Sequence, residues 1–291
     1  MAKLLGIHGI GQQGKTASQL VSEWYPACCA GLQAAEGSPV KSDDFTCTFY
    51  ADLFQGLTAT LGDDDVNEEW FEDFVEVLAQ EQIRLEKEQD DTATLGYGMA
   101  LGMRLGLDRA LRILMGLPIF GGLSAHAVRL SLSQVRKFLF NQAVREQILE
   151  RVAASVLPDT QIILAHSLGS VVAYEALRLH PEWQVHTLIT LGSPLGISKV
   201  IFDHLTPPRD SGGRAPWPGN IRRWINLADR GDIVSLRRDL CPLFRDGNAI
   251  QDVLVDNGWR EAHDATRYLA APQTGRALIE ALTTNQLQLP L

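Results

Sequence analysis

The stretch QIILAHSLGS, residues 161–170, decides the fold because it places one serine between a buried strand and a helix. The apolar residues before Ser167 are too few for a helix and predict a strand, whereas Val171–Leu179 is rich in Ala and Leu and predicts a helix. A chain that reverses from strand to helix within a couple of residues needs small residues on both sides, since the backbones come close. Ala165 and Gly169 meet this need, so the sequence predicts a sharp, strained turn that presents Ser167.

This turn resembles the nucleophile elbow of the α/β-hydrolase family, usually Gly-x-Ser-x-Gly and here Ala165-His166-Ser167-Leu168-Gly169. Alanine at the first glycine position departs from the family pattern by one methyl group, which strains a tight turn. The resemblance implies that Ser167 is the nucleophile and that the N–H of Leu168 helps to bind the oxyanion. The alternative is a serine that only caps the following helix.

A serine hydroxyl needs a base near neutral pH, and the family places a histidine base last in the chain, after the acid. The chain has seven histidines, of which only His263 follows every plausible acid. It lies between a predicted last strand, Gln251–Asp256, and a predicted closing helix, Thr274–Leu287. The alternative is a loop histidine with no catalytic task. The chain order favours His263 as general base.

Two carboxylates compete for the third role, which is to orient the histidine. Asp229 follows the predicted strand Ile221–Leu227 directly, whereas Asp232 follows a glycine and precedes two β-branched residues. Sequences that resemble Gly-Asp-x-Val carry the acid on that aspartate in many lipase-like hydrolases, which favours Asp232. Asp229 stays the alternative, Asp239 and Asp246 are more remote, and each could instead be a turn residue.

The N-terminal segment also resembles the family. Lys3–Ile7 predicts a buried strand that runs into the sequence HGIG at 8–11. The resemblance implies that this loop supplies the second oxyanion donor, the N–H of Ile10 or of Gly9. We also expect His8, Gly9 and His166 to contact the substrate.

The same segment, from Gly9 to Thr16, matches the phosphate-loop pattern G-x-x-x-x-G-K-[ST]. In that interpretation Lys15 would contact the terminal phosphates, Thr16 would hold magnesium and Asp229 would complete the metal site. It leaves the serine turn and the last histidine unexplained. We therefore favour a serine hydrolase that cleaves carboxylic or lipid esters without a metal or cofactor. A nucleotide hydrolase and a non-catalytic hydrolase-fold binding protein are the alternatives.

The composition predicts one globular domain, since 45% of the 291 residues are hydrophobic and 21% are charged. A net charge of -9 without a basic cluster argues against nucleic acid as a partner. The four cysteines lack metal-site spacing and predict reduced thiols in a cytoplasmic protein. Glycines interrupt the apolar N-terminus, so we expect a strand there rather than a signal peptide.

Six strand signals alternate with helical patterns, which predicts an α/β fold with a mostly parallel twisted sheet and helices on both faces. These signals are Lys3–Ile7, Phe45–Tyr50, Ile162–Ala165, Thr187–Leu191, Arg223–Leu227 and Val253–Val255. The turn at Leu191–Gly196 resembles a loop that lines the site of lipase-type hydrolases. We expect a single domain over residues 1–291, with a helical insertion at about 58–125.

Within the insertion, Asp63–Asp91 predicts a helix with one apolar face. Leu95–Leu123 predicts an amphipathic helical cap over the site, with a buried helical hairpin or a segment on a membrane surface as alternatives. Val128–Val156 predicts one long helix that leads into the serine strand. The residues expected to contact an acyl group from the cap are Leu101, Leu105 and Leu111.

Overall fold

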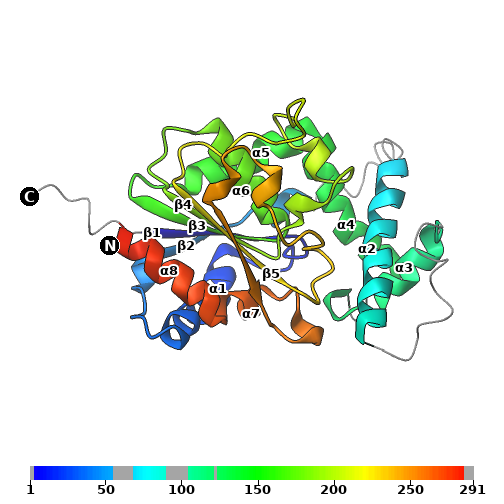
Figure 1. The fold of residues 1–291 in the computed structure, drawn as a ribbon, viewed down its shortest axis with the longest axis horizontal. Helices are drawn as coiled ribbons and strands as arrows, with labels where there is room; N and C mark the ends of the chain where they lie inside the picture. The colour runs from blue at the N-terminus through cyan, green and yellow to red at the C-terminus, as the bar shows by residue number, and fades with distance from the viewer. Residues whose placement is uncertain (1–2, 55–67, 90–103, 121–122, 285–291) are drawn as a thin grey trace, which may run out of the picture.

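The computed structural model describes residues 3–54, 68–89, 104–120 and 123–284 of the chain, in which six strands form one sheet (Figure 1). The strands are β1 (Lys3–Ile7), β2 (Phe45–Thr48), β3 (Thr160–His166), β4 (Thr187–Leu191), β5 (Arg223–Asp229) and β6 (Ile250–Val255). Their order in the sheet is β2-β1-β3-β4-β5-β6, and every neighbouring pair is parallel. The predicted α/β fold with a parallel sheet is therefore confirmed.

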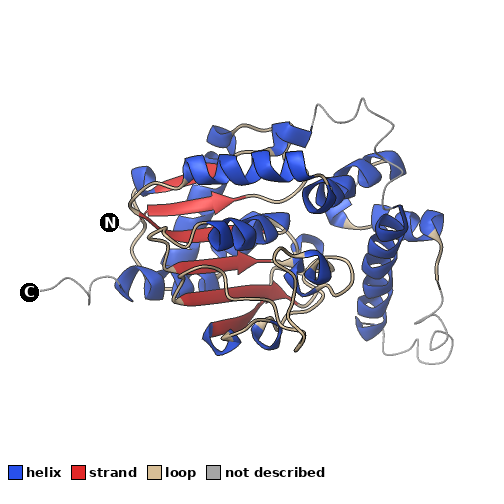
Figure 2. Cartoon of the chain, turned by 90° about the horizontal axis from the view of Figure 1, so that it is seen from above, coloured by secondary structure: helices blue, strands red, loops and turns tan. Residues whose placement is uncertain are grey.

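Helices cover both faces of this sheet (Figures 1 and 2). The helices of the described residues are α1 (Ala17–Ala34), α2 (Glu68–Gln89), α3 (Leu107–Met115), α4 (Ala125–Phe140), α5 (Gln142–Ser155), α6 (Leu168–Leu179), α7 (Ala265–Ala270) and α8 (Pro272–Thr284). Of these, α2 and α3 lie beyond the ends of the strands and do not cover the sheet. Successive strand residues point to opposite faces. Ile162 and Leu164 of β3 accordingly join the apolar cluster under α1 and α8, whereas Ile163 and Ala165 join the cluster on the other face.

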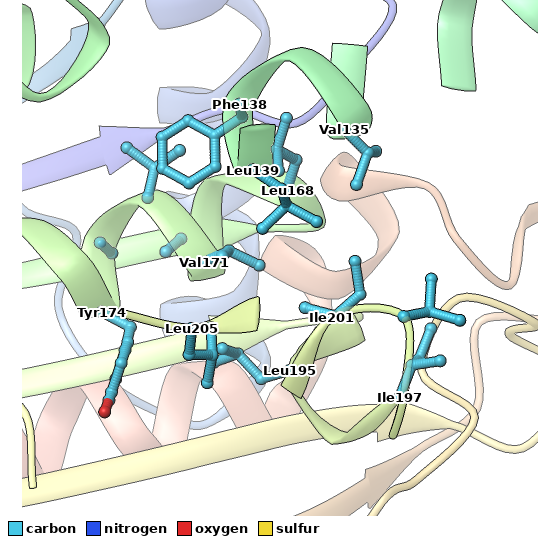
Figure 3. Close-up of a cluster of buried hydrophobic side chains, with 14 of the residues drawn as sticks. Val135, Phe138, Leu139, Leu168, Val171, Tyr174, Leu195, Ile197, Ile201 and Leu205 are labelled. Atoms are coloured by element: carbon cyan, nitrogen blue, oxygen red, sulfur yellow. The ribbon is translucent and has the colours of Figure 1, made fainter. Parts of the chain in front are cut away.

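The second cluster fixes the helix that follows the serine. Figure 3 shows Phe138 and Leu139 of α4 beside Leu168 and Val171 of α6, and all four belong to one buried cluster. Leu168 is 1% exposed. Because its side chain is anchored in the core, the start of α6 is held firmly at the carboxyl end of β3.

The prediction of one long helix over Val128–Val156 is wrong, because the chain breaks at Asn141. This residue is extended, with φ −100° and ψ 101°, and it ends α4. Its side-chain oxygen accepts a hydrogen bond from the N–H of Val144 at 3.1 Å and so caps α5. Asparagine competes well for backbone donors at helix starts, which local periodicity does not reveal.

The insertion stands beyond the carboxyl ends of the strands, where α2, α3 and α4 pack against one another (Figure 2). Leu111 and Leu114 of α3 are buried in this contact, so the apolar stripe of α3 is covered by protein as a buried hairpin would be. Leu111 borders neither of the two cavities at Ser167 that are described below, so the structure gives no support to the prediction that it contacts an acyl group. Leu105 is half-buried against the same core, and Leu101 lies outside the described residues.

None of the helices in the described ranges has both the length and the apolarity that crossing a membrane requires.

Candidate active site

The site lies where the strand order reverses. From β1 the chain crosses one face through α1 to β2, and it later returns to β3 on the other side of β1. Helices α1 and α6, which follow β1 and β3, lie on opposite faces. Loops that diverge in this way leave a crevice at the carboxyl edge of the sheet, where open α/β sheets bind ligands. Ser167 follows β3 and Gly9 follows β1, so both lie at this crevice.

Ser167 occupies a strained turn, as the sequence predicts. Its φ of 54° and ψ of −130° place it in a region that residues with a side chain rarely adopt. The two flanking backbones come very close. A Cβ at Gly169 would lie 2.3 Å from the carbonyl oxygen of Ile7, and a Cβ at Gly9 would lie 2.5 Å from the Cβ of Ser167. Only glycine fits at either position.

Three side chains that are far apart in the sequence form one series of hydrogen bonds at this turn. His263 Nε2 lies 3.0 Å from Ser167 Oγ, and His263 Nδ1 lies 2.8 Å from Asp232 Oδ2. An ionised carboxylate only accepts hydrogen bonds, so Nδ1 carries the imidazole proton. The lone pair of Nε2 is then free to accept the hydroxyl proton of Ser167. The structure thus brings together the serine, histidine and aspartate that the sequence analysis favours.

Asp232 is 1% exposed, and its carboxylate is fully hydrogen-bonded. Oδ2 also accepts from the hydroxyl of Tyr268 at 2.8 Å, and Oδ1 accepts from the N–H of Val234 at 2.8 Å. Burial alone would raise the pKa of Asp232, but His263 and these donors bring its pKa below the usual value. The site therefore holds a permanent negative charge beside Nδ1 of His263.

Tyr268 is a residue of the candidate site that sequence reasoning missed. Its side chain is completely buried, and its hydroxyl accepts a hydrogen bond from the N–H of Asp229 at 2.8 Å while donating to Asp232. No motif marks it, because it comes from helix α7 and reaches the acid only through the tertiary fold.

Gly192, in the predicted site-lining turn after β4, also touches the acid and base. Its φ is +56°, and a Cβ there would lie 2.6 Å from Asp232 Oδ2 and 3.0 Å from His263 Nδ1. The backbone of this turn therefore packs directly against the Asp232–His263 pair, which leaves no room for a side chain.

Asp229, the alternative acid, has a different task. Its Oδ1 accepts from the N–H of Gly231 at 2.7 Å, and its Oδ2 accepts from the N–H of Asn257 at 2.5 Å. Burial raises the pKa of Asp229. The carboxylate joins the loop after β5 to the chain after β6, and it makes no hydrogen bond to His263 among the described residues.

His8 does not border the site cavity, contrary to the prediction that it contacts the substrate. It is 1% exposed and stacks on Tyr50. Its Nδ1 donates to the carbonyl of Gly9 at 2.7 Å, and its Nε2 accepts from the N–H of Tyr50 at 3.2 Å. Burial lowers the pKa of His8 to about 4. Its neutral ring therefore holds the loop after β1, and Gly9 also lies behind the cavity wall rather than in it.

His166 borders the cavity as expected. Its Nε2 donates to the carbonyl of His263 at 2.9 Å, and the two ring centres are 4.6 Å apart. Burial lowers the pKa of His166 to about 3. Its neutral ring thus supports the backbone of the residue that faces Ser167.

The buried neutral His8 should make the fold sensitive to acid. Its folded pKa of about 4 lies below the value of 6.5 for an exposed histidine. Between these values the unfolded chain binds the extra proton, so stability is highest above about pH 6.5 and falls as the pH drops towards 4. At pH 5 this amounts to about 2 kcal/mol of the unfolding free energy.

Urea unfolding of the wild type and of His8→Asn at pH 7 and pH 5 measures this effect. The variant should be less stable at pH 7, but its loss between the two pH values should be smaller by about 2 kcal/mol. An equal loss in both proteins would rule out His8 as a source of the acid sensitivity.

Two cavities meet at Ser167. The larger has a volume of about 670 Å³ and is bordered by His166, His263 and the residues around Ile10. The smaller, of about 20 Å³, lies on the side of Leu168. The insertion lines this smaller cavity through Phe74 and Leu78 of α2 and through Phe120, rather than through α3.

The two expected oxyanion donors flank the serine. Leu168 is the first residue of α6, so its N–H lacks an acceptor within the helix and lies at the positive end of the helix dipole. Ile10 borders both cavities. The loop that carries it is held by a hydrogen bond of 3.3 Å from the N–H of Gly11 to Oε1 of Gln134 on α4.

The phosphate-loop interpretation finds little support in this geometry. Lys15 Nζ pairs with Glu23 Oε2 at 2.5 Å, and Thr16 Oγ1 caps α1 by accepting from the N–H of Gln19 at 3.3 Å. Asp229 ends β5, which is three strands away from β1, a separation of roughly 14 Å at the usual strand spacing. It is therefore too distant to complete a magnesium site at Thr16.

Comparison of the sequence with protein-family models and with curated proteins finds no match. Among the described residues, no group of three or more His, Cys, Asp or Glu side chains is arranged to hold a metal ion.

Proposed function

We propose that this chain is a serine hydrolase of the α/β-hydrolase type, which cleaves carboxylic esters through an acyl-enzyme on Ser167. The observation that carries the proposal is the hydrogen-bonded series from Ser167 through His263 to Asp232, at a strained turn beside an open cavity. An exposed histidine or a capping serine requires no such alignment. The positions after β3, β5 and β6 also follow the Ser, Asp, His order of that family.

In the proposed reaction, Nε2 of His263 takes the hydroxyl proton as Ser167 Oγ attacks the carbonyl carbon. The tetrahedral oxyanion is bound by the N–H groups of Leu168 and Ile10. The imidazolium then gives its proton to the departing alcohol. Water enters and attacks the acyl carbon while His263 takes one of its protons. The bond from the acyl carbon to Ser167 Oγ then breaks, the imidazolium returns the proton to Oγ, and the acid leaves.

Asp232 supports both proton transfers. Its low pKa keeps it ionised while His263 gains and loses a proton, so the imidazolium always faces a negative charge. Tyr268 and the N–H of Val234 hold the carboxylate in place. Asp232 therefore fixes the tautomer and the orientation of the base without taking up a proton itself.

Lys15→Ala separates this proposal from nucleotide hydrolysis. The Lys15 ammonium is half-exposed and already paired with Glu23, so its removal should change kcat/KM for an activated ester by no more than a few fold, about 1 kcal/mol or less. The measurement is turnover of p-nitrophenyl acetate beside titration with ATP and magnesium. If the wild type bound ATP, Lys15→Ala did not, and the wild type turned over no ester, the phosphate-loop function would be favoured instead.

A further inference from the structure

The two cavities at Ser167 differ greatly in size. The larger, of about 670 Å³, is within the range of small-molecule sites. It is lined by the loops after β1, β5 and β6, and by Leu117, Phe120 and Leu123 of the insertion. The smaller, of about 20 Å³, is a slot beneath the insertion. Four residues border both: Ile10, Phe120, Ser167 and His263. A group bound covalently to Ser167 could therefore extend into either one.

The slot is apolar and its walls are fixed. Phe74 and Leu78 come from α2, and Leu132 and Val135 come from α4. These four side chains are at most 5% exposed and belong to the same buried apolar cluster as Leu168 and Val171 of α6. Apart from Ser167 and His263, every residue that lines the slot within the described chain is apolar.

The proposed chemistry assigns one substrate group to each cavity. The acyl group stays on Ser167 after the first step, whereas the alcohol takes a proton from His263 and leaves, and water must then reach the same place. The large cavity is lined by the loop that carries His263, together with the polar side chains of Gln12 and Gln13. The alcohol and the water therefore use the large cavity, and the slot is left for the acyl chain.

The volume of the slot limits that chain. A space of about 20 Å³ holds one or two groups the size of a water molecule or a methyl group, since each needs roughly 10–15 Å³ on this measure. We propose that the slot beside Ser167 is an acyl subsite for two or three carbons, which makes short-acyl esters the substrates of this chain. This inference rests on the proposed function.

A series of p-nitrophenyl esters from acetate to octanoate tests the proposal with a constant leaving group. We expect kcat/KM to be highest for acetate or propionate and to fall by about tenfold or more at octanoate, because additional methylene groups meet packed side chains. A kcat/KM for octanoate that equals or exceeds the value for acetate would overturn it.

Leu132→Ala tests the walls directly, because it enlarges the slot from α4. The preferred acyl length should move to four or six carbons. Leu139→Ala is the matched control, since Leu139 is a buried leucine of the same helix that does not line the slot. It should lower the melting temperature and leave the preference unchanged.

An unchanged preference in folded Leu132→Ala would overturn the proposal. If that variant does not fold, Val234→Ala gives the same comparison, because Val234 lines the slot from a half-exposed loop.

A fluorophosphonate probe on the same samples distinguishes failure of the short-acyl subsite from failure of the proposed function. Labelling of Ser167 with a preference for long acyl chains overturns the short-acyl subsite alone. Failure of both labelling and ester turnover overturns the proposed function and the subsite with it.

Discussion

Ser167→Ala is expected to lower kcat/KM for ester hydrolysis by about 10³-fold or more, because it removes the atom that forms the acyl-enzyme in the proposed reaction. The variant should remain folded. Ala and Ser carry the same backbone strain at a φ of 54°, and the lost hydroxyl bonds only to His263 among the described residues. The measurement is turnover of p-nitrophenyl acetate at equal concentrations of folded protein.

Ser133→Ala is the matched control for this change. Ser133 is also buried, but it lies on α4 and its hydroxyl donates to the carbonyl of Leu130 in its own helix. We expect full activity from this variant. Wild-type turnover in folded Ser167→Ala would instead remove the nucleophile, and with it the serine hydrolase assignment.

Asp232→Asn is expected to cause the second large loss, of about 10³- to 10⁴-fold in kcat. Three donors surround the carboxylate: Nδ1–H of His263, the hydroxyl of Tyr268 and the N–H of Val234. An amide has only one oxygen. If this oxygen accepts from Val234, the NH₂ group faces His263, so Nδ1 must accept and Nε2 carries the proton. The base can then no longer take the proton of Ser167.

The opposite orientation of the amide also fails. Its NH₂ group would face the N–H of Val234, which leaves two donors opposed in a buried place, at a cost of about 1–3 kcal/mol. In both orientations the negative charge beside the imidazolium is lost.

Asp229→Asn is the comparison variant, because Asp229 accepts hydrogen bonds from the N–H groups of Gly231 and Asn257 and not from the imidazole of His263. It should lower the melting temperature while keeping kcat within about tenfold of the wild type, since only loop support is lost. If Asp229→Asn were the less active of the two folded variants, the assignment of the acid would have to be exchanged.

Much of the sheet could be predicted from the sequence. The bounds of β1 and β4 agree with the predicted Lys3–Ile7 and Thr187–Leu191, because strands buried on both faces are continuous apolar runs that end at polar residues or glycine. The turn at Ser167 was predictable for a similar reason. The glycine at 169 is needed because the backbone of Ile7 nearly touches it.

Other features depend on contacts that no local pattern contains. The break at Asn141 arises from a single capping hydrogen bond, which helical periodicity does not register. The stripe on α3 indicates that one face is covered, but not that α2 and α4 cover it rather than a substrate. The roles of His8 and Tyr268 depend on their buried hydrogen-bond partners, and the sequence alone does not indicate which residues those partners are.

The most direct test of the central claim is the stoichiometry and position of a fluorophosphonate adduct on the full chain. We expect one adduct per folded molecule, on the peptide that contains Ser167, with none in Ser167→Ala, much slower labelling in Asp232→Asn and normal labelling in Ser133→Ala. Absence of an adduct on the folded wild type would contradict the proposed serine hydrolase function and favour a non-catalytic binding protein. An adduct on any other residue would contradict the assignment of Ser167.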